Sequence, residues 1–144
     1  SNADPNSSGG KQMIFDAAAK GCTKRVEWLA EKGASLEGLS NWGGKSPLHA
    51  AATYNRTETV AKLISLGAAI DASDRDGYTP AHLAAHAGQE EALRLLVEAG
   101  AEVCSRTKEG KTVLDLARIR KFRLKGMDEG FCDRMTEVDG GQPD

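Results

Sequence analysis

The stretch GKSPLHAAATYN at residues 44–55 decides the fold, because it occurs more than once in the chain. It returns as GYTPAHLAAHAG at residues 77–88, and again, with fewer identities, as GKTVLDLARIRK at residues 110–121. The copies begin 33 residues apart. A reacting site usually occurs once, whereas a pattern repeated at a fixed interval of this size indicates stacked structural units.

A second motif accompanies the first. It reads VEWLAEKGA at residues 26–34, VAKLISLGA at residues 60–68 and LRLLVEAGA at residues 93–101. The first two copies are 34 residues apart, so one residue is inserted in the loop that carries Asn41 and Trp42. Two motifs in a constant order predict two structural elements in each repeat.

Both motifs have the pattern of short helices. Thr79 is a suitable N-cap, and Pro80 then takes the first helical position, where its missing N–H costs no hydrogen bond. The alanines of residues 80–87 would let a neighbouring helix approach closely. Leu93 and Leu96 recur at helical spacing among charged residues, which is typical of an amphipathic second helix.

Gly21, Asn55 and Gly88 fall at the same point of each repeat, between the two helical runs. Glycine and asparagine are the residues that accept a left-handed backbone most readily. We therefore expect a left-handed corner there, and this explains Asn55 better than the glycosylation sequon to which it belongs.

The 33-residue period, with its T-P-x-H and G-A marks, resembles the ankyrin repeat family from about residue 12 to residue 122. The resemblance implies an all-α repeat fold, an ankyrin solenoid of antiparallel helix pairs joined by β-hairpin-like finger loops. The expected organisation is a disordered tag remnant and linker, then an ankyrin repeat domain over residues 11–125, then a capping segment and disordered acidic tail. The tag remnant and linker cover residues 1–10, and the capping segment and tail cover residues 126–144. The repeats cover residues 11–43, 44–76, 77–109 and 110–125, and the last of them is partial.

The histidines of the repeat are interpreted as structural. His49 and His82 recur in register, as scaffolding groups do and catalytic groups need not, and Pro47 and Pro80 recur with them. His82 and His86 are four residues apart on one helix, but the Glu of a zinc-binding H-E-x-x-H is missing. We expect no metal, no cofactor and no catalytic residue, and therefore no enzyme.

Composition narrows the function further. The net charge of −2 gives no argument for nucleic acid or an anionic membrane, and no apolar run approaches a membrane-spanning length. Cys22, Cys104 and Cys132 are odd in number and widely spaced, which favours free thiols in a reducing compartment, either cytoplasm or nucleus.

The resemblance implies that a partner binds on the concave face made by finger tips and inner helices. Both tyrosines and one of the two tryptophans of the chain map there, and aromatic residues dominate interface energies. The same face carries six basic residues and only two acidic ones, so we expect an acidic or neutral partner surface. The basic residues are Lys45, Arg75, Arg106, Lys108, Lys111 and Arg120. The candidate partner-binding residues are Trp42, Lys45, Tyr54, Arg75, Asp76, Tyr78, His86, Lys108 and Lys111.

The sequence thus predicts a non-catalytic protein–protein interaction module, an adaptor, scaffold or inhibitor, that is a monomer and takes no small-molecule substrate. One alternative is a targeting segment of a larger multidomain enzyme. Another is weak nucleic-acid contact through residues 118–125, which hold five cations, although a solvated helix face explains these charges better. Trp28, on the second helix of the first repeat, is expected to face partly outward or to cover the N-terminal end.

Overall fold

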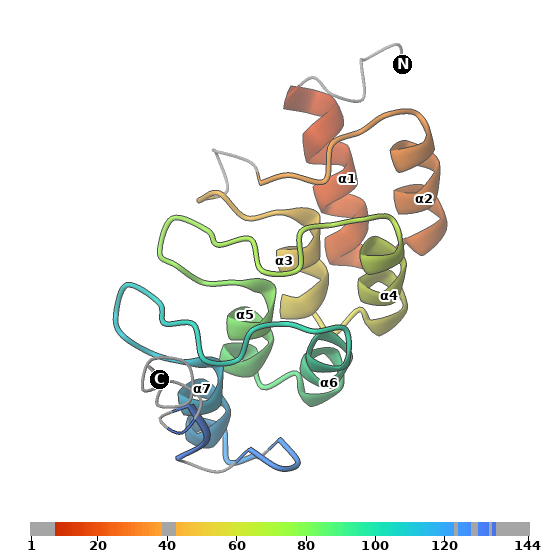
Figure 1. The fold of residues 1–144 in the computed structure, drawn as a ribbon. Helices are drawn as coiled ribbons and strands as arrows, with labels where there is room; N and C mark the ends of the chain where they lie inside the picture. The colour runs from red at the N-terminus through yellow and green to blue at the C-terminus, as the bar shows by residue number, and fades with distance from the viewer. Residues whose placement is uncertain (1–7, 39–42, 123, 128–129, 133, 135–144) are drawn as a thin grey trace, which may run out of the picture.

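The structure is a computed structural model that describes residues 8–38, 43–122, 124–127, 130–132 and 134. Seven helices form within this part of the chain. They are α1 (Ser8–Lys20), α2 (Thr23–Glu31), α3 (Pro47–Thr53), α4 (Thr57–Ser65), α5 (Pro80–Ala87), α6 (Glu90–Glu98) and α7 (Val113–Ile119). Figure 1 shows two rows, an inner row of α1, α3, α5 and α7 and an outer row of α2, α4 and α6, with the long loops projecting to one side.

The inner helices begin where the repeated motif predicts. Ser46 precedes α3, and its hydroxyl accepts a hydrogen bond from the backbone N–H of His49 at 3.4 Å. Thr79 does the same for α5, where the N–H of His82 donates at 3.3 Å. A side-chain oxygen at this point satisfies one of the backbone donors that a helix leaves unpaired at its start.

The corner between the two helices of a repeat is left-handed, as the sequence predicts. Gly21 and Gly88 both have φ of +78°, and Asn55 has φ of +58°. The Asn55 side chain also accepts a hydrogen bond from the N–H of Ala92 in the next outer helix, at 3.1 Å. The corner therefore joins two neighbouring repeats in addition to turning the chain.

One apolar core runs through the whole stack. The inner helices contribute mainly alanines, including the fully buried Ala18, Ala51 and Ala84, and the outer helices contribute Leu63 and Leu96. Small side chains on the inner row permit close packing of consecutive helices. No repeat buries its apolar face alone, so the stability of each depends on its neighbours.

The N-terminal end differs slightly from the prediction. Helix α1 begins at Ser8, three residues inside the range 1–10 that the sequence predicted to be disordered. Residues 1–7 lie outside the described residues. Trp28 is 51% exposed on α2, with the ammonium of Lys32 5.6 Å from its ring centroid, in agreement with the predicted outward position.

At the C-terminal end, apolar residues replace the missing second helix of the last repeat. Leu124 is 6% exposed, and Met127 and Phe131 pack against the core. These three residues and Cys132 are called the C-terminal cap below. The acidic tail predicted beyond them lies outside the described residues.

The cysteine prediction is wrong for two of the three thiols. Cys104 and Cys132 form a disulfide, with Cα atoms 5.4 Å apart, and only Cys22 is a free, exposed thiol among the described cysteines. The cap folds back over the last repeat and brings Cys132 to the start of the last finger. Wide spacing in sequence therefore did not prevent close approach in space.

The finger loops have hairpin-like tips without strands in the described part of the chain. The N–H of Asp74 donates to the carbonyl of Tyr78 at 2.8 Å, and the N–H of Thr107 donates to that of Lys111 at 2.9 Å. Each tip is thus a closed turn of five residues at the same place in its repeat. No helix of the described residues has the length and apolar content to cross a membrane.

Candidate functional site

The two repeated histidines connect the inner helices α3 and α5 to the finger that follows each of them. The ring of His49 is fully buried, and its Nε2 donates to the carbonyl of Tyr78 at 2.8 Å. The equivalent Nε2 of His82 donates to the carbonyl of Ser105 at 2.8 Å. These bonds fix the fingers, and with them the residues at the finger tips.

The other ring nitrogen fixes the tautomer. Nδ1 of His49 accepts from the backbone N–H of Ser46 at 3.0 Å, and Nδ1 of His82 accepts from that of Thr79 at 3.1 Å. Because Nδ1 accepts a hydrogen bond, the ring proton is on Nε2 and each imidazole is neutral. Burial lowers the pKa of both histidines below 6.5, and the carbonyls that accept from Nε2 oppose this shift without reversing it.

The finger tips are built around one polar side chain each. The carboxylate of Asp74 accepts from the backbone N–H groups of Asp76 and Tyr78, both at 2.9 Å. At the equivalent place in the next finger, the hydroxyl of Thr107 accepts from the N–H groups of Glu109 and Lys111, both at 3.2 Å. Side chains that bond their own backbone in this way set the shape of a turn.

Asp74 also forms an ion pair with one of the predicted binding residues. Its side chain is 2% exposed, and the ammonium of Lys45 lies 3.2 Å from its carboxylate. Burial alone would raise the pKa of Asp74, but the N–H donors of Tyr78 and Asp76, together with Lys45, bring it below 3.8. The charge of Lys45 therefore supports the finger and is largely cancelled for a partner.

Adjacent fingers are joined backbone to backbone at equivalent positions. The N–H of Arg75 donates to the carbonyl of Gly43 at 2.9 Å, and the N–H of Lys108 donates to that of Asp76 at 3.0 Å. A Cβ on Gly77, which has φ of +82°, would come within 3.0 Å of the Lys108 nitrogen. Only glycine allows the two fingers to approach this closely.

Most of the remaining predicted binding residues are exposed. Arg75, Asp76, His86, Lys108 and Lys111 are exposed, and Tyr54 at the end of α3 is 55% exposed. Trp42 lies outside the described residues. Pro47 and Pro80 are buried at the first positions of α3 and α5.

Tyr78 lies between the finger and the inner helix. Its ring meets the rings of His82 and His86 edge-on, with centroids 5.8 Å and 6.0 Å away. Its hydroxyl donates to the carboxylate of Glu109 on the next finger at 3.3 Å. Burial and the negative charge of Glu109 raise the pKa of Tyr78 above 10.0, so this hydroxyl stays protonated.

The basic stretch over residues 118–125 is partly used by the fold itself. Arg118 pairs with Asp115 at 3.0 Å, and Nε of Arg120 donates to the carbonyl of His86 at 2.7 Å. Arg56 makes the same kind of bond to the carbonyl of Ala19, at 2.9 Å. Arg56 and Arg120 thus donate to carbonyls near the ends of inner helices, and Arg118 pairs with a carboxylate of its own helix, so these three cations are used within the fold.

The geometry places this chain among the repeat proteins in which stacked helix pairs display a row of equivalent loops. The family model described as ankyrin repeats (many copies) matches residues 48–97, which span α3 to α6. Residues 48–97 of this chain therefore match ankyrin repeats. Proteins of this family are generally protein–protein interaction modules and typically have no enzymatic activity.

Sequence reasoning missed the role of two acids that shape the site, Asp74 and Glu109. Glu109 was placed on the contact face, but its bond to Tyr78 was not predicted. Asp74 had a readable signal, since an aspartate three residues before a turn glycine commonly bonds the turn's own backbone. Glu109 had none, because its role depends on the neighbouring finger. Within the described residues, no three side chains of His, Cys, Asp or Glu gather as metal ligands would.

Proposed function

We propose that this chain is a protein-binding module whose contact surface is the row of finger tips and the adjoining inner-helix residues. The contact surface comprises Tyr54, Arg75, Tyr78, His86, Lys108 and Lys111. Trp42 belongs to the same proposal on its sequence position alone. The bound segment of the partner carries carboxylates.

One observation supports the acidic partner above the others. Arg75 and Lys108 occupy equivalent positions on neighbouring fingers, and their backbones are held in register by hydrogen bonds of 2.9 Å and 3.0 Å. Both side chains are exposed, and neither pairs with a carboxylate in the described part of the chain. Two cations held at a fixed spacing lose little entropy when a partner binds.

One of the nearby acids is unavailable to repel such a partner, because Asp74 is buried against Lys45. Asp76 and Glu109 are exposed and remain negative charges at the tips, and Glu109 accepts a hydrogen bond from the hydroxyl of Tyr78. Tyr54 and Tyr78 add aromatic surface, which dominates the energy of many interfaces.

The test compares two double variants of equal charge change. Arg75→Glu with Lys108→Glu reverses the finger tips, whereas Lys24→Glu with Arg25→Glu reverses two exposed cations on the outer helix α2. Immobilised chain would be incubated with lysate, and bound proteins quantified by mass spectrometry. We expect the finger variant to lose at least 90% of the specific capture, because bringing like charges together across an interface costs several kcal/mol.

The outer-helix variant should keep the capture of the unaltered chain. Equal capture by both double variants would contradict the assignment of the surface. Tyr54→Ala and Trp42→Ala, each measured alone, then show whether an aromatic anchor lies at either end of the row.

A further inference from the structure

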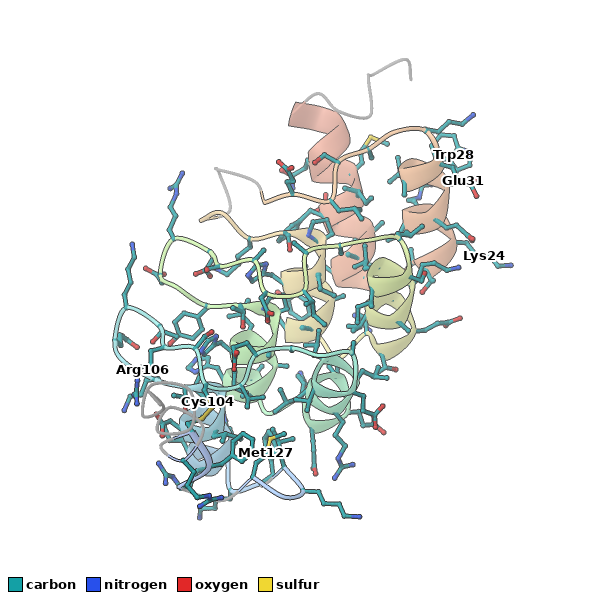
Figure 2. All side chains as sticks on the ribbon, viewed as in Figure 1. Lys24, Trp28, Glu31, Cys104, Arg106 and Met127 are labelled. Carbon is teal, nitrogen blue, oxygen red and sulfur yellow. A yellow bond between two sulfur atoms is a disulfide. The ribbon has the colours of Figure 1, made fainter. Side chains whose placement is uncertain are left out.

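The Cys104–Cys132 disulfide joins the last finger to the C-terminal cap across a sequence separation of 28 residues. Figure 2 labels Cys104 beside α7, with Arg106 on the same finger and Met127 in the cap. Cys104 is half-buried, and Cys132 is 8% exposed. The bond therefore connects a finger of the contact surface to the segment that closes the end of the stack.

The disulfide lies at the end of the stack, where the pairing of inner with outer helices stops. Elsewhere α1, α3 and α5 are each covered by an outer helix, but the described residues after α7 form turns, an isolated bridge between Leu124 and Met127, and helical residues at 131, 132 and 134. The cap makes local hydrogen bonds, such as the 3.0 Å bond from the N–H of Met127 to the carbonyl of Leu124. The disulfide and the packing of Leu124, Met127 and Phe131 against the core join the cap to the rest of the stack.

We propose that Cys104–Cys132 is a reversible redox-modification site at which a dithiol reductant opens the C-terminal cap. A thiolate of the reductant attacks the sulfur of Cys104, which belongs to the more exposed residue, and Cys132 leaves as a thiolate and takes up a proton. The second thiol of the reductant then attacks the mixed disulfide and releases Cys104. The reductant loses two electrons and two protons and becomes a disulfide, and the two cysteines gain both.

Opening is confined to the end of the stack. Repeats interact only with their neighbours, so loss of the cap removes one interface and leaves the others. The last finger keeps its bonds to the preceding repeat, from His82 to Ser105 and from Lys108 to Asp76. Reduction therefore frees the C-terminal cap beside a finger that stays in place.

Hydrogen exchange of the full chain tests this directly. The Cys22→Ser background removes the third thiol, and the protein would be compared in glutathione disulfide buffer and after treatment with dithiothreitol. We expect amides of residues 122–134 to exchange at least tenfold faster in the reduced protein. Amides of α3 to α6 should change less than twofold. Equal exchange in the two states, or loss of protection throughout, would overturn the proposal.

Thiol alkylation and substitutions give independent evidence. The unaltered chain in glutathione disulfide buffer should yield one alkylated cysteine, Cys22, and three alkylated cysteines would show that the disulfide does not form. Cys132→Ser should reproduce the reduced exchange pattern without reductant, while Cys22→Ser alone keeps the oxidised pattern. Reoxidation should restore slow exchange of residues 122–134, and failure to do so would refute reversibility.

Discussion

The junctions inside the stack and the end of the last repeat use the same backbone position in different ways. In α3 and α5 this position holds His49 and His82, and each ring reaches forward to a carbonyl of the next finger. In α7 it holds Asp115, which accepts from the N–H of Thr112 and pairs with Arg118 within its own helix. All three residues complete the cap of their helix.

The difference shows which part of the motif is local and which part joins repeats. A cap needs only an acceptor for the N–H at the helix start, and a carboxylate serves as well as an imidazole. A connection to the following finger also needs a donor on the far side of the ring. Histidine provides both, and it is replaced by aspartate where no further finger follows in the described structure.

The largest expected effect comes from replacing the connecting residue. His82→Ala leaves a cavity and removes the partners of the Ser105 carbonyl and the Thr79 N–H, so we expect a loss of about 3–4 kcal/mol in the free energy of unfolding. Asp115→Ala removes a cap and an ion pair with the exposed Arg118, and should cost about 1 kcal/mol, because exposed ion pairs contribute little. Urea unfolding followed by circular dichroism measures both. Similar losses for the two variants would remove the distinction between connection and cap.

A second comparison uses the glycines of the finger tips. Gly77 and Gly110 have φ of +82° and +84°, so alanine at either one is strained by about 1–2 kcal/mol. At Gly77 the added Cβ would also meet Thr107 and Lys108 at 3.1 Å and 3.0 Å, whereas at Gly110 nothing lies within 4 Å. Urea unfolding should show Gly77→Ala to be about 1 kcal/mol less stable than Gly110→Ala. An equal loss would mean that neighbouring fingers separate easily.

The smallest of these effects is a dependence of stability on pH. Folding lowers the pKa of His49 and His82 below 6.5. The neutral rings therefore contribute their full share to the free energy of unfolding above pH 6.5, and this contribution declines as the pH falls below 6.5. The pKa of Asp115 is lowered from 3.8: burial opposes the shift, and the Thr112 donors and Arg118 outweigh it. Its contribution is therefore lost only in stronger acid. Between pH 7 and pH 5 only the interior junctions should weaken.

Urea midpoints at pH 7 and pH 5 measure this change. His82→Gln removes one titrating ring, so its midpoint should shift less between the two pH values than that of the unaltered chain. Asp115→Asn is the matched control and should shift as much as the unaltered chain. If His82→Gln shifted as much as the unaltered chain, a different group would be responsible for the pH dependence.

The fold could be predicted largely from the sequence, because the repeat makes each local signal appear more than once. The caps at Ser46 and Thr79 and the left-handed Asn55 follow from local chemistry that does not depend on distant residues. A capping segment was also expected, over residues 126–144, whereas the apolar cap begins at Leu124 and only part of the expected range is described.

The details that sequence reasoning missed all depend on contacts between repeats or across long separations. The disulfide depends on how the cap folds back, which the spacing of Cys104 and Cys132 does not reveal. Lys45 was predicted as a contact residue, but its charge meets the buried Asp74, which lies 29 positions further along the chain. Sequence reasoning therefore named finger residues that are exposed, but it did not show which of their charges are paired within the fold.

The hydrogen bond from each histidine ring to the following finger also has a consequence for how such a chain can gain or lose repeats. The bond from His82 to the Ser105 carbonyl lies within residues 77–109, so a copy of these residues placed before Gly110 would carry both its ring and its acceptor. Whole units can therefore be added at this point with this connection complete. A partial copy that contained His82 without Ser105 would leave its imidazole without that carbonyl, which favours duplication by full periods.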